Sequence, residues 1–382
     1  MRIGILTGGG DVPGLNTVIH DVTYRAAREK NIEVIGIKRG WGGLIYMNPD
    51  IPYIDPEHAI NLTQDVVRRF DREGGTFLRT SRTQPSQVKD HLGLRKYRNL
   101  EFKGKRDMTS QVIKNLRNLK IDTLIAIGGD DTLSYALHLH QQGVPVIGIP
   151  KTMDGDVAGT DYCIGFSTAI TRSNQYVTDL RSHLGSHERI GVIEVFGRYS
   201  GFTALYTALA AKTDRLVIPE VQFDINKLAG LLVDDKKRNP SNYCIVIVSE
   251  GAKPLGGGEV LKSDRTDAYG NRKLGGIGEM IAEKLEEMTR EEVTEENLRY
   301  LLRSGSPTAK DKIVASRFAN LAVDAILKNK SGVMTSIQNG KLHLASLEET
   351  AASPVKVNAA LQYDIERYMP NYKNLEGSGI LL

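Results

Sequence analysis

Four carboxylates and one lysine follow two apolar runs in the first half of the chain. Residues 124–127 are apolar and are followed at 128–131 by Gly-Gly-Asp-Asp. Residues 144–149 are also apolar and are followed at 150–156 by Pro-Lys-Thr-Met-Asp-Gly-Asp. Glycines let backbone N–H groups approach a phosphate, but carboxylates at the same place would repel that phosphate unless Mg²⁺ lies between them. The pattern therefore indicates Mg²⁺-dependent phosphoryl transfer.

The elements that must position these residues are neighbouring strands of a parallel sheet. Both apolar runs have the length of a buried strand, and a helix is expected between them, which makes a βαβ unit. The carboxyl ends of parallel strands meet at one edge of an open α/β sheet, where ligands bind. We therefore expect the acidic residues and Lys151 to face one shared cleft.

The N-terminus has a similar arrangement with glycines in place of acids. A strand expected at residues 3–7 is followed by three glycines and Asp11, and Pro13 with Gly14 opens a helix that leads to a strand at 32–37. The spacing matches neither the dinucleotide-binding fingerprint nor the Walker loop. A tight turn would account for some of the glycines, but three exceed its needs, which favours an anion cradle at a helix N-terminus.

A second glycine-led loop, at residues 74–85, carries Arg79 and Arg82. Arginines usually face solvent, but two of them among Gly, Thr and Ser favour anion binding.

The rest of the chain alternates strands and helices, as an α/β fold of two halves requires. Residues 251–274 are rich in Gly and Lys and are expected to form a loop or irregular insertion. Two halves facing each other would make a cleft with acidic residues on one wall and arginines on the other. The further expected elements are strands at 189–195, 216–218, 242–248 and 298–303, helices at 111–119, 168–184, 201–211, 278–289, 308–328 and 356–368, and a hairpin at 334–344.

Composition excludes several classes of function. A chain of 382 residues is too long for one small hydrophobic core, which favours two domains. A net charge of +4 without a basic tract argues against nucleic-acid binding. No apolar run approaches the ~20 residues of a membrane span, and no signal sequence is visible at the N-terminus, so we expect a cytoplasmic protein. Cys163 and Cys244 are expected to be buried thiols, and His183 and His187, which lack an acidic third ligand, to face solvent.

Together these motifs resemble the phosphofructokinase family, from the first strand to about residue 345. The resemblance implies two doubly wound, Rossmann-like α/β domains with the active site in the cleft between them. Residues 1–165 plus about 307–356 would form the phosphoryl-donor domain, and residues 166–306 plus about 357–382 the sugar-phosphate domain. The implied reaction is Mg²⁺-dependent transfer of a phosphoryl group to the 1-hydroxyl of fructose 6-phosphate, giving fructose 1,6-bisphosphate.

The resemblance also assigns roles to individual residues. Asp154 would accept the proton of the sugar 1-hydroxyl, Asp130 would hold Mg²⁺, and Gly10 and Arg82 would contact the donor. Arg189 is characteristically supplied by a neighbouring subunit, which implies a homodimer or homotetramer. The residues that would bind the sugar phosphate are Thr152, Met153, Asp156, Arg189, Phe196, Gly197, Arg198, Glu250, Tyr300 and Arg303.

The phosphoryl donor is indicated by two departures from the ATP-using members, which usually read GGDG[ST] and PGT. This chain reads GGDDT and PKT, which resembles the pyrophosphate-dependent branch. Glycine leaves room for the α-phosphate of a nucleotide, whereas the Asp131 carboxylate would occupy that room and repel the phosphate. Lys151 would supply positive charge for the leaving phosphate, although some ATP-using relatives also carry lysine there. The resemblance thus implies a reversible, pyrophosphate-dependent reaction.

Other departures concern the sugar and regulation. Gly155 replaces the usual Asn, Phe196 replaces Met, and Thr294 stands where ATP-type bacterial enzymes place a phosphate-binding arginine. Sedoheptulose 7-phosphate is therefore a second acceptor to test. His20 and Tyr24 stand where those enzymes carry effector-binding arginines, so we expect a non-allosteric enzyme.

Three alternatives stay open. The first is the same fold using ATP, and Asp131 is the residue that argues against it. The second is a lipid or NAD kinase, which shares a GGDGT-like motif but has no place for the segments 152–156 and 196–198 or for the turn at Arg303. The third is a catalytically silent homologue, against which the presence of Asp130, Asp154, Asp156, Arg189 and Arg198 argues.

Overall fold

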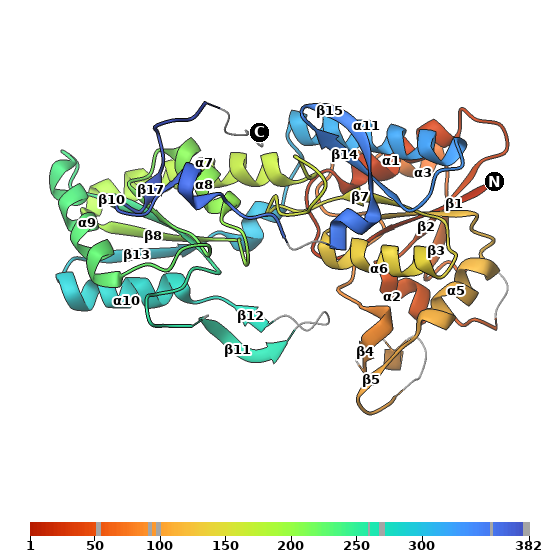
Figure 1. Cartoon of the computed structure of the whole chain (residues 1–382), viewed down its shortest axis with the longest axis horizontal. Helices are drawn as coiled ribbons and strands as arrows, with labels where there is room; N and C mark the ends of the chain where they lie inside the picture. The colour runs from red at the N-terminus through yellow and green to blue at the C-terminus, as the bar shows by residue number, and fades with distance from the viewer. Residues whose placement is uncertain are drawn as a thin grey trace.

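The chain forms two α/β lobes, each built around its own sheet (Figure 1). The computed structural model describes residues 1–50, 55–90, 94–96, 101–258, 260–266, 272–351 and 354–376. The first-lobe sheet has the order β15-β14-β7-β6-β1-β2-β3 and the second-lobe sheet the order β13-β8-β10-β9. Strands β2, β1, β6, β7 and β14 run parallel, with antiparallel β3 and β15 at the edges, and the second sheet is parallel throughout.

The first-lobe strands are β1 (Arg2–Thr7), β2 (Glu33–Ile37), β3 (Ala59–Leu62), β6 (Thr123–Gly128), β7 (Val146–Pro150), β14 (Val333–Gln338) and β15 (Lys341–Ser346). The second-lobe strands are β8 (Ile190–Val195), β9 (Arg215–Val217), β10 (Cys244–Ser249) and β13 (Val293–Asn297). The boundaries of the two domains stay a prediction, whereas the sheet to which each strand belongs is observed.

Helices cover both faces of each sheet (Figure 1). In the first lobe, α1 (Leu15–Ala26) and α11 (Ala309–Leu327) lie on one face, and α2 (Gly40–Tyr46), α5 (Thr109–Asn118) and α6 (Asp130–Gln141) lie on the other. In the second lobe, α7 (Phe166–His187) and α8 (Phe202–Ala211) lie opposite α9 (Ile225–Arg238) and α10 (Ile277–Thr289). A parallel sheet buried on both faces confirms the predicted doubly wound fold.

The strand sequences account for this double burial. In β6, Ile125 and Ile127 pack into the core on the α1 and α11 side, while Leu124 and Ala126 pack into the core on the opposite side. Side chains alternate between the two faces of a strand, so a strand with helices on both faces must be apolar at nearly every position. The continuous apolar runs seen in the sequence have this origin.

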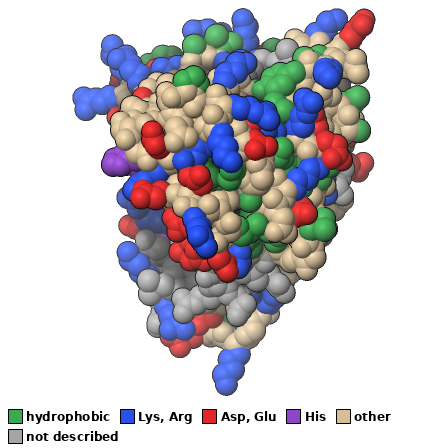
Figure 2. Space-filling view, turned by 90° about the vertical axis from the view of Figure 1, so that its left-hand side faces the viewer, with side chains coloured by type: hydrophobic (Ala, Val, Ile, Leu, Met, Phe, Trp, Pro, Cys, Tyr) green, Lys and Arg blue, Asp and Glu red, His purple; other side chains and the backbone are tan. Residues whose placement is uncertain are grey.

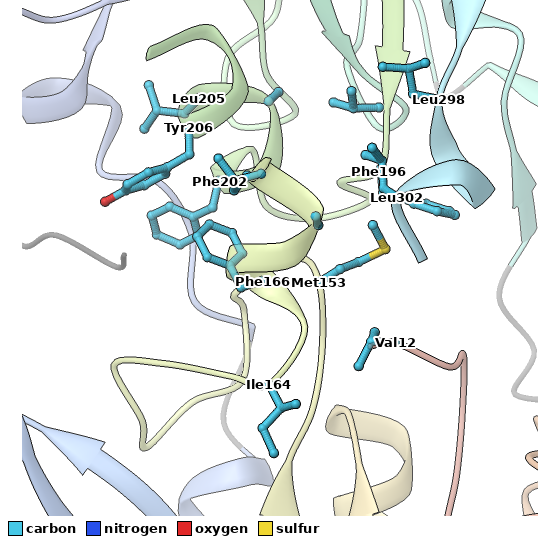
Figure 3. Close-up of a cluster of buried hydrophobic side chains, with 14 of the residues drawn as sticks. Val12, Met153, Ile164, Phe166, Phe196, Phe202, Leu205, Tyr206, Leu298 and Leu302 are labelled. Carbon is cyan, nitrogen blue, oxygen red and sulfur yellow. The ribbon is translucent and has the colours of Figure 1, made fainter. Parts of the chain in front are cut away.

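The two lobes share one hydrophobic cluster, to which both contribute side chains (Figure 3). Val12 and Ile164 of the first lobe belong to the same buried cluster as Phe166 and Phe202 of the second, and Met153 lies between them. Because this cluster is continuous, it fixes how the loops of one lobe face those of the other.

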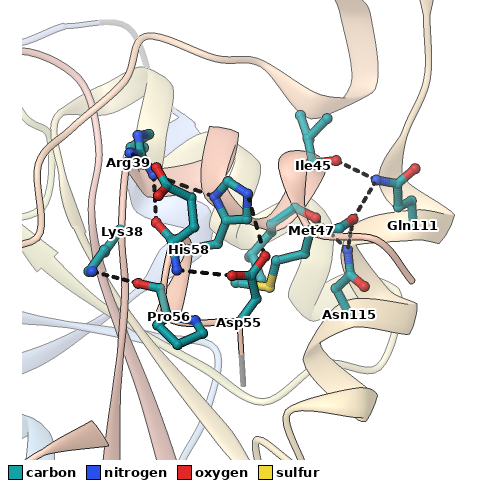
Figure 4. A network of polar contacts seen from close by, with 11 residues as sticks. Lys38, Arg39, Ile45, Met47, Asp55, Pro56, His58, Gln111 and Asn115 are labelled. Atoms are coloured by element: carbon teal, nitrogen blue, oxygen red, sulfur yellow. Dashed lines mark hydrogen bonds and ion pairs between the residues drawn. The ribbon is translucent and has the colours of Figure 1, made fainter. Parts of the chain in front are cut away.

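Helix α2 and strand β3 were not anticipated from the sequence. Helix α2 follows Arg39, which adopts a left-handed backbone conformation, and Asn115 of α5 donates hydrogen bonds to the carbonyls of Leu44 and Met47 at 2.7 and 3.1 Å (Figure 4). Arg39 also pairs with Glu57 at 2.6 Å. These contacts are long-range, so the local pattern gave no sign of them.

Three predicted elements were wrong, and α9 was missed. Residues 298–303 form a 3₁₀ helix, η2 (Arg299–Arg303), because pairing with β8 uses the charged segment β13 instead. Near the C-terminus the expected helix is reduced to α12 (Ala359–Gln362), followed by β16 (Tyr363–Asp364) and β17 (Met369–Pro370). The expected loop at 251–274 contains an antiparallel pair, β11 (Leu261–Thr266) and β12 (Arg272–Leu274), although part of that range lies outside the described residues.

The remaining described elements are short: α3 (Gln64–Val67), η1 (Pro85–Gln87), β4 (Val88–Lys89), β5 (Lys105–Arg106) and η3 (Leu347–Ala351). Cys163 and Cys244 are buried free thiols, and His183 and His187 are exposed on α7, as predicted. The end of the second lobe that faces away from the first carries interspersed basic and acidic side chains (Figure 2). Among the described helices, none has the length and apolar character to cross a membrane.

Candidate active site

A cavity of about 380 Å³ opens between the two lobes, at the carboxyl ends of β1, β6 and β7. We call its two sides the first-lobe wall and the second-lobe wall. The first-lobe wall consists of Gly9, Gly10, Arg82, Gly129, Asp130, Asp131, Thr132, Lys151, Thr152, Asp154 and Asp156. The second-lobe wall consists of Phe196, Arg198, Tyr199, Glu250, Leu274, Arg299, Tyr300 and Arg303.

The glycine loop after β1 lets side chains approach the backbone closely. Gly9 has a φ of +77°, which favours glycine, and a Cβ on Gly10 would lie 2.5 Å from a guanidinium nitrogen of Arg303. The Arg303 guanidinium donates to the carbonyl of Asp11 at 3.1 Å. The loop therefore contacts an arginine of the opposite lobe.

Lys151 is almost fully buried beneath this loop and donates from Nζ to the carbonyl of Gly10 at 2.6 Å. Burial, followed by the positive charge of Arg303, lowers its pKa to about 7, and the charge of Asp11 opposes this shift. A lysine with this pKa is ready to gain charge when an anion enters the cavity.

Asp154 and Asp156 are the acidic residues after β7. Burial raises the pKa of both carboxyls, and the charge of Asp130 raises them further. The Asp154 backbone N–H donates to the Thr152 hydroxyl at 3.1 Å, which in turn donates to Asp156 at 3.3 Å. Asp154 Oδ1 is buried and has no hydrogen-bond partner in the structure. Because an unpartnered buried carboxylate oxygen is costly, this atom marks a place for a ligand group.

Asp130 and Asp131 occupy the first turn of α6, where the helix dipole stabilises negative charge. Both side chains line the cavity together with Gly10 and Lys151. The strand ends β1, β6 and β7 thus bring together the residues that the sequence placed at one sheet edge.

Met153 and Gly197 do not line the cavity. Met153 is 1% exposed and packs into the shared cluster, and its carbonyl accepts a hydrogen bond from Thr203 at 2.9 Å, which holds the acidic loop in place. Gly197 has a φ of +135°, and a Cβ there would lie 2.3 Å from the Ser249 hydroxyl. Each therefore shapes the backbone beside the site. Gly155, with a φ of +68°, keeps the left-handed conformation that Asn also tolerates.

Arg189 lies away from the cavity. It precedes β8 at the amino end of the strand, whereas the cavity lies at the carboxyl end. Within this chain it pairs with Glu292 at 2.6 Å. Within the described part of the chain, no residue of the cavity wall forms a hydrogen bond or ion pair with the Arg189 side chain.

On the second-lobe wall, the guanidinium carbon of Arg303 lies 4.5 Å from the ring centroid of Phe196. The Phe196 ring also meets Tyr300 edge-on at 5.7 Å. Burial, with help from the charge of Asp154, raises the pKa of Glu250 to about 6. This wall therefore combines a cation held over an aromatic ring with a carboxylate that titrates near neutral pH.

Arg299 is a wall residue that the sequence did not single out. It is 9% exposed, and its Nη1 donates to Glu250 Oε2 at 3.0 Å. Its position directly before Tyr300 was the only available signal, because its acidic partners are distant in sequence.

Comparison with known proteins shows which family this chain resembles in sequence and in fold. A family model described as Phosphofructokinase matches residues 2–326. An ATP-dependent 6-phosphofructokinase 3 of Streptomyces coelicolor is 35% identical, covering 92% of this chain and 95% of its own length. A pyrophosphate–fructose 6-phosphate 1-phosphotransferase of Thermoproteus tenax is 35% identical, covering 97% and 99%. The solved pyrophosphate-dependent phosphofructokinase of Nitrosospira multiformis superimposes with a TM-score of 0.78 at 19% identity, over 97% of this chain and 89% of that one.

Proposed function

Because the chain belongs to the phosphofructokinase family of phosphotransferases, we propose that it transfers a phosphoryl group reversibly from pyrophosphate to the 1-hydroxyl of fructose 6-phosphate. The products are fructose 1,6-bisphosphate and phosphate. Relatives named for pyrophosphate and for ATP are equally similar to this chain, so the choice of donor depends on particular residues.

The observation that carries the proposal is the position of Asp131 on the first-lobe wall. It lines the same cavity as Gly10 and Lys151, at the start of α6. An α-phosphate with its nucleoside would have to pass a second carboxylate beside Asp130, and like charges in a partly desolvated site repel strongly. Pyrophosphate has no nucleoside to carry past that carboxylate, so it avoids this repulsion.

Asp154 supports the chemistry of the acceptor. The sugar hydroxyl attacks phosphorus as its proton moves to Asp154, while the bond from phosphorus to the bridging oxygen of pyrophosphate breaks. The unpartnered Oδ1 of Asp154 is the atom we assign to this proton. The Lys151 ammonium stabilises the charge that develops on the departing phosphate.

Mg²⁺ fits the residues present on the first-lobe wall. The described residues contain no group of three or more His, Cys, Asp or Glu side chains arranged as a metal cage. Mg²⁺ in phosphoryl-transfer sites is usually bound by one or two carboxylates together with substrate phosphates, and Asp130 on the cavity wall matches that smaller set. When bound at Asp130, the ion would neutralise charge on the phosphates.

The second-lobe wall would bind the sugar phosphate. Arg198 and Arg303 supply positive charge, Glu250 accepts hydrogen bonds from sugar hydroxyls, and Tyr300 lies at the rim with 72% of its surface exposed. Arg189 lies outside this cavity, so we assign it to the site of a second subunit in a homodimer or homotetramer. A cytoplasmic location is part of the same proposal.

We also propose that nucleotides do not regulate the enzyme. The rings of His20 and Tyr24 stack on α1 with their centroids 4.1 Å apart, and His20 Nδ1 lies 2.6 Å from Asp21 Oδ1. This surface offers an anionic effector a carboxylate in place of arginines. A sigmoidal fructose 6-phosphate curve that ADP sharpens or relaxes would contradict the proposal.

The test is a reaction of purified protein with Mg²⁺, fructose 6-phosphate and either pyrophosphate or ATP, followed by ³¹P NMR. We expect fructose 1,6-bisphosphate to form with pyrophosphate, and the reverse reaction to proceed from fructose 1,6-bisphosphate and phosphate. Product from ATP alone would leave the family assignment intact and exclude the proposed donor.

A further inference from the structure

Arg299 forms a chain of contacts that runs from the interior of the second lobe to the cavity. Its Nε lies 3.3 Å from Glu194 Oε1, and its Nη1 donates to Glu250 Oε2 at 3.0 Å. A second hydrogen bond from Nη1 reaches the carbonyl of Leu274, also at 3.0 Å. One guanidinium thus connects a strand interior, the end of β12 and a residue of the cavity wall.

The inner end of the chain is fixed. Glu194 lies in β8 and is fully buried. Its Oε2 accepts the backbone N–H of Gly278 at 2.9 Å in the first turn of α10, and its Oε1 accepts the amide of Asn297 at 3.2 Å. A carboxylate at a helix N-terminus is held by backbone donors and by the helix dipole. Arg299 is therefore anchored to a fully buried carboxylate that has its own hydrogen-bond donors.

The guanidinium also has no room to turn. Gly275 has a φ of +139°, and a Cβ there would lie 2.8 Å from Nη1 of Arg299. The backbone between β12 and α10 lies in close contact with the Arg299 guanidinium. The position of this guanidinium therefore also determines that of the Glu250 carboxylate to which it donates.

We propose that Arg299 is a positioning residue for sugar recognition: it holds the Glu250 carboxylate ionised and oriented toward the acceptor in the cavity. The inference deepens the function proposed above and rests on it. Arg299 lies on the second-lobe wall and acts there through Glu250.

The charges around Glu250 determine what the loss of Arg299 would do. Burial and the charge of Asp154 favour the protonated carboxyl, while three cations favour the ionised form. The three cations are Arg198, Arg299 and Arg303. Arg299 is the one that also donates a hydrogen bond to the carboxylate. Removing it raises the pKa of Glu250 above its value of about 6, and the protonated carboxyl loses an acceptor for the sugar hydroxyls.

The experiment measures binding of fructose 6-phosphate by calorimetry from about pH 5.5 to about pH 8, for wild type, Arg299→Met and Arg299→Lys. In wild type we expect binding to weaken as the pH falls through about 6. In Arg299→Met the same weakening should begin about one pH unit higher, so Kd should be about twofold larger than in wild type at pH 7 and about eightfold larger at about pH 5.5. Arg299→Lys, which keeps the charge, should lie between the two. The phosphate of the sugar also titrates at about pH 6, so Glu250→Gln should keep only the weakening that the sugar phosphate contributes, and the difference from wild type reports the carboxyl.

Arg215→Met is the matched control. Arg215 is 7% exposed, pairs with Asp235 at 2.5 Å in the same lobe and does not line the cavity. Its loss should therefore lower the melting temperature without changing the pH at which binding of fructose 6-phosphate weakens. If Arg299→Met does not fold, Arg299→Lys carries the test. A folded Arg299 variant in which binding weakens at the same pH as in wild type would overturn this inference and leave the proposed function standing. A wild-type protein that binds no fructose 6-phosphate would overturn the proposed function and this inference with it.

Discussion

The two walls of the cavity are held in place by different kinds of contact. On the first-lobe wall, polar residues follow directly after β1, β6 and β7, and backbone hydrogen bonds fix the loops, as when Gly8 donates to Ile127 and Lys151 to Gly128, both at 2.9 Å. On the second-lobe wall, side chains distant in sequence hold one another, as Arg299 holds Glu250 and Phe196 packs against Arg303. The second wall also begins at strand ends, where the Glu250 N–H donates to the Val195 carbonyl at 3.0 Å, but side-chain contacts between its members add to this backbone support.

This difference predicts a division of effects. Changes on the first-lobe wall should alter the chemical step and the donor, because the backbone keeps the remaining groups in place. Changes on the second-lobe wall should alter affinity for the sugar phosphate and should spread to neighbours, because each side chain supports another. The predictions below test this division from the largest expected effect to the smallest.

Asp154→Asn should give the largest loss. Removing the proton acceptor is expected to lower kcat on the order of 10³-fold, while the affinity for fructose 6-phosphate stays close to that of wild type. Steady-state kinetics and calorimetry measure the two quantities. An equal loss in Kd and kcat would show that Asp154 belongs to sugar binding as well, and the division between the walls would fail at this residue.

Lys151→Gln should lower kcat/KM for pyrophosphate by about 10²-fold, because the charge that stabilises the leaving phosphate is lost. In wild type the same charge disappears from the free enzyme as the pH rises through about 7, so kcat/KM for the donor should fall above that pH. The glutamine variant should lack this alkaline limb. A limb that persists in the variant would assign the titration to another group.

Glu250→Gln should raise KM for fructose 6-phosphate by about tenfold, with little change in KM for pyrophosphate. The amide keeps the shape of the side chain but loses the charge that pairs with Arg299. Initial rates with each substrate varied in turn separate the two constants. A change confined to the donor KM would reverse the assignment of the walls.

Phe196→Met should give the smallest effect. It removes the aromatic face under Arg303 and keeps an apolar side chain there, so KM for fructose 6-phosphate should change by roughly threefold. The melting temperature serves as the control for packing, since Phe196 is 7% exposed. A loss as large as that of Glu250→Gln would show that the ring has a direct role in sugar binding.

The same difference explains how far the sequence could predict the site. Lys151, Asp130 and Asp154 were found because a strand end and the few residues after it are visible as one local pattern. Arg299 was missed because its partners, Glu194 and Glu250, stand 105 and 49 residues away.

Secondary structure follows the same rule. The buried parallel strands were found from their apolar runs, whereas β13 was missed because Val-Thr-Glu-Glu-Asn carries no apolar pattern at the edge of its sheet. The expected C-terminal helix gave way to β16 and β17 because Tyr363 and Tyr368 are buried against β9, where the Tyr363 hydroxyl donates to the carbonyl of Leu216 at 2.8 Å. Tertiary packing decided both regions.

The most direct test of the account is the ratio of kcat/KM for pyrophosphate to that for ATP, measured with Mg²⁺ and fructose 6-phosphate in wild type and in Asp131→Gly. We expect wild type to use pyrophosphate and not ATP, and the glycine variant to gain ATP activity because the carboxylate beside Gly10 and Lys151 is gone. A wild type that prefers ATP, or a glycine variant whose ratio is unchanged, would contradict the assignment of donor choice to Asp131.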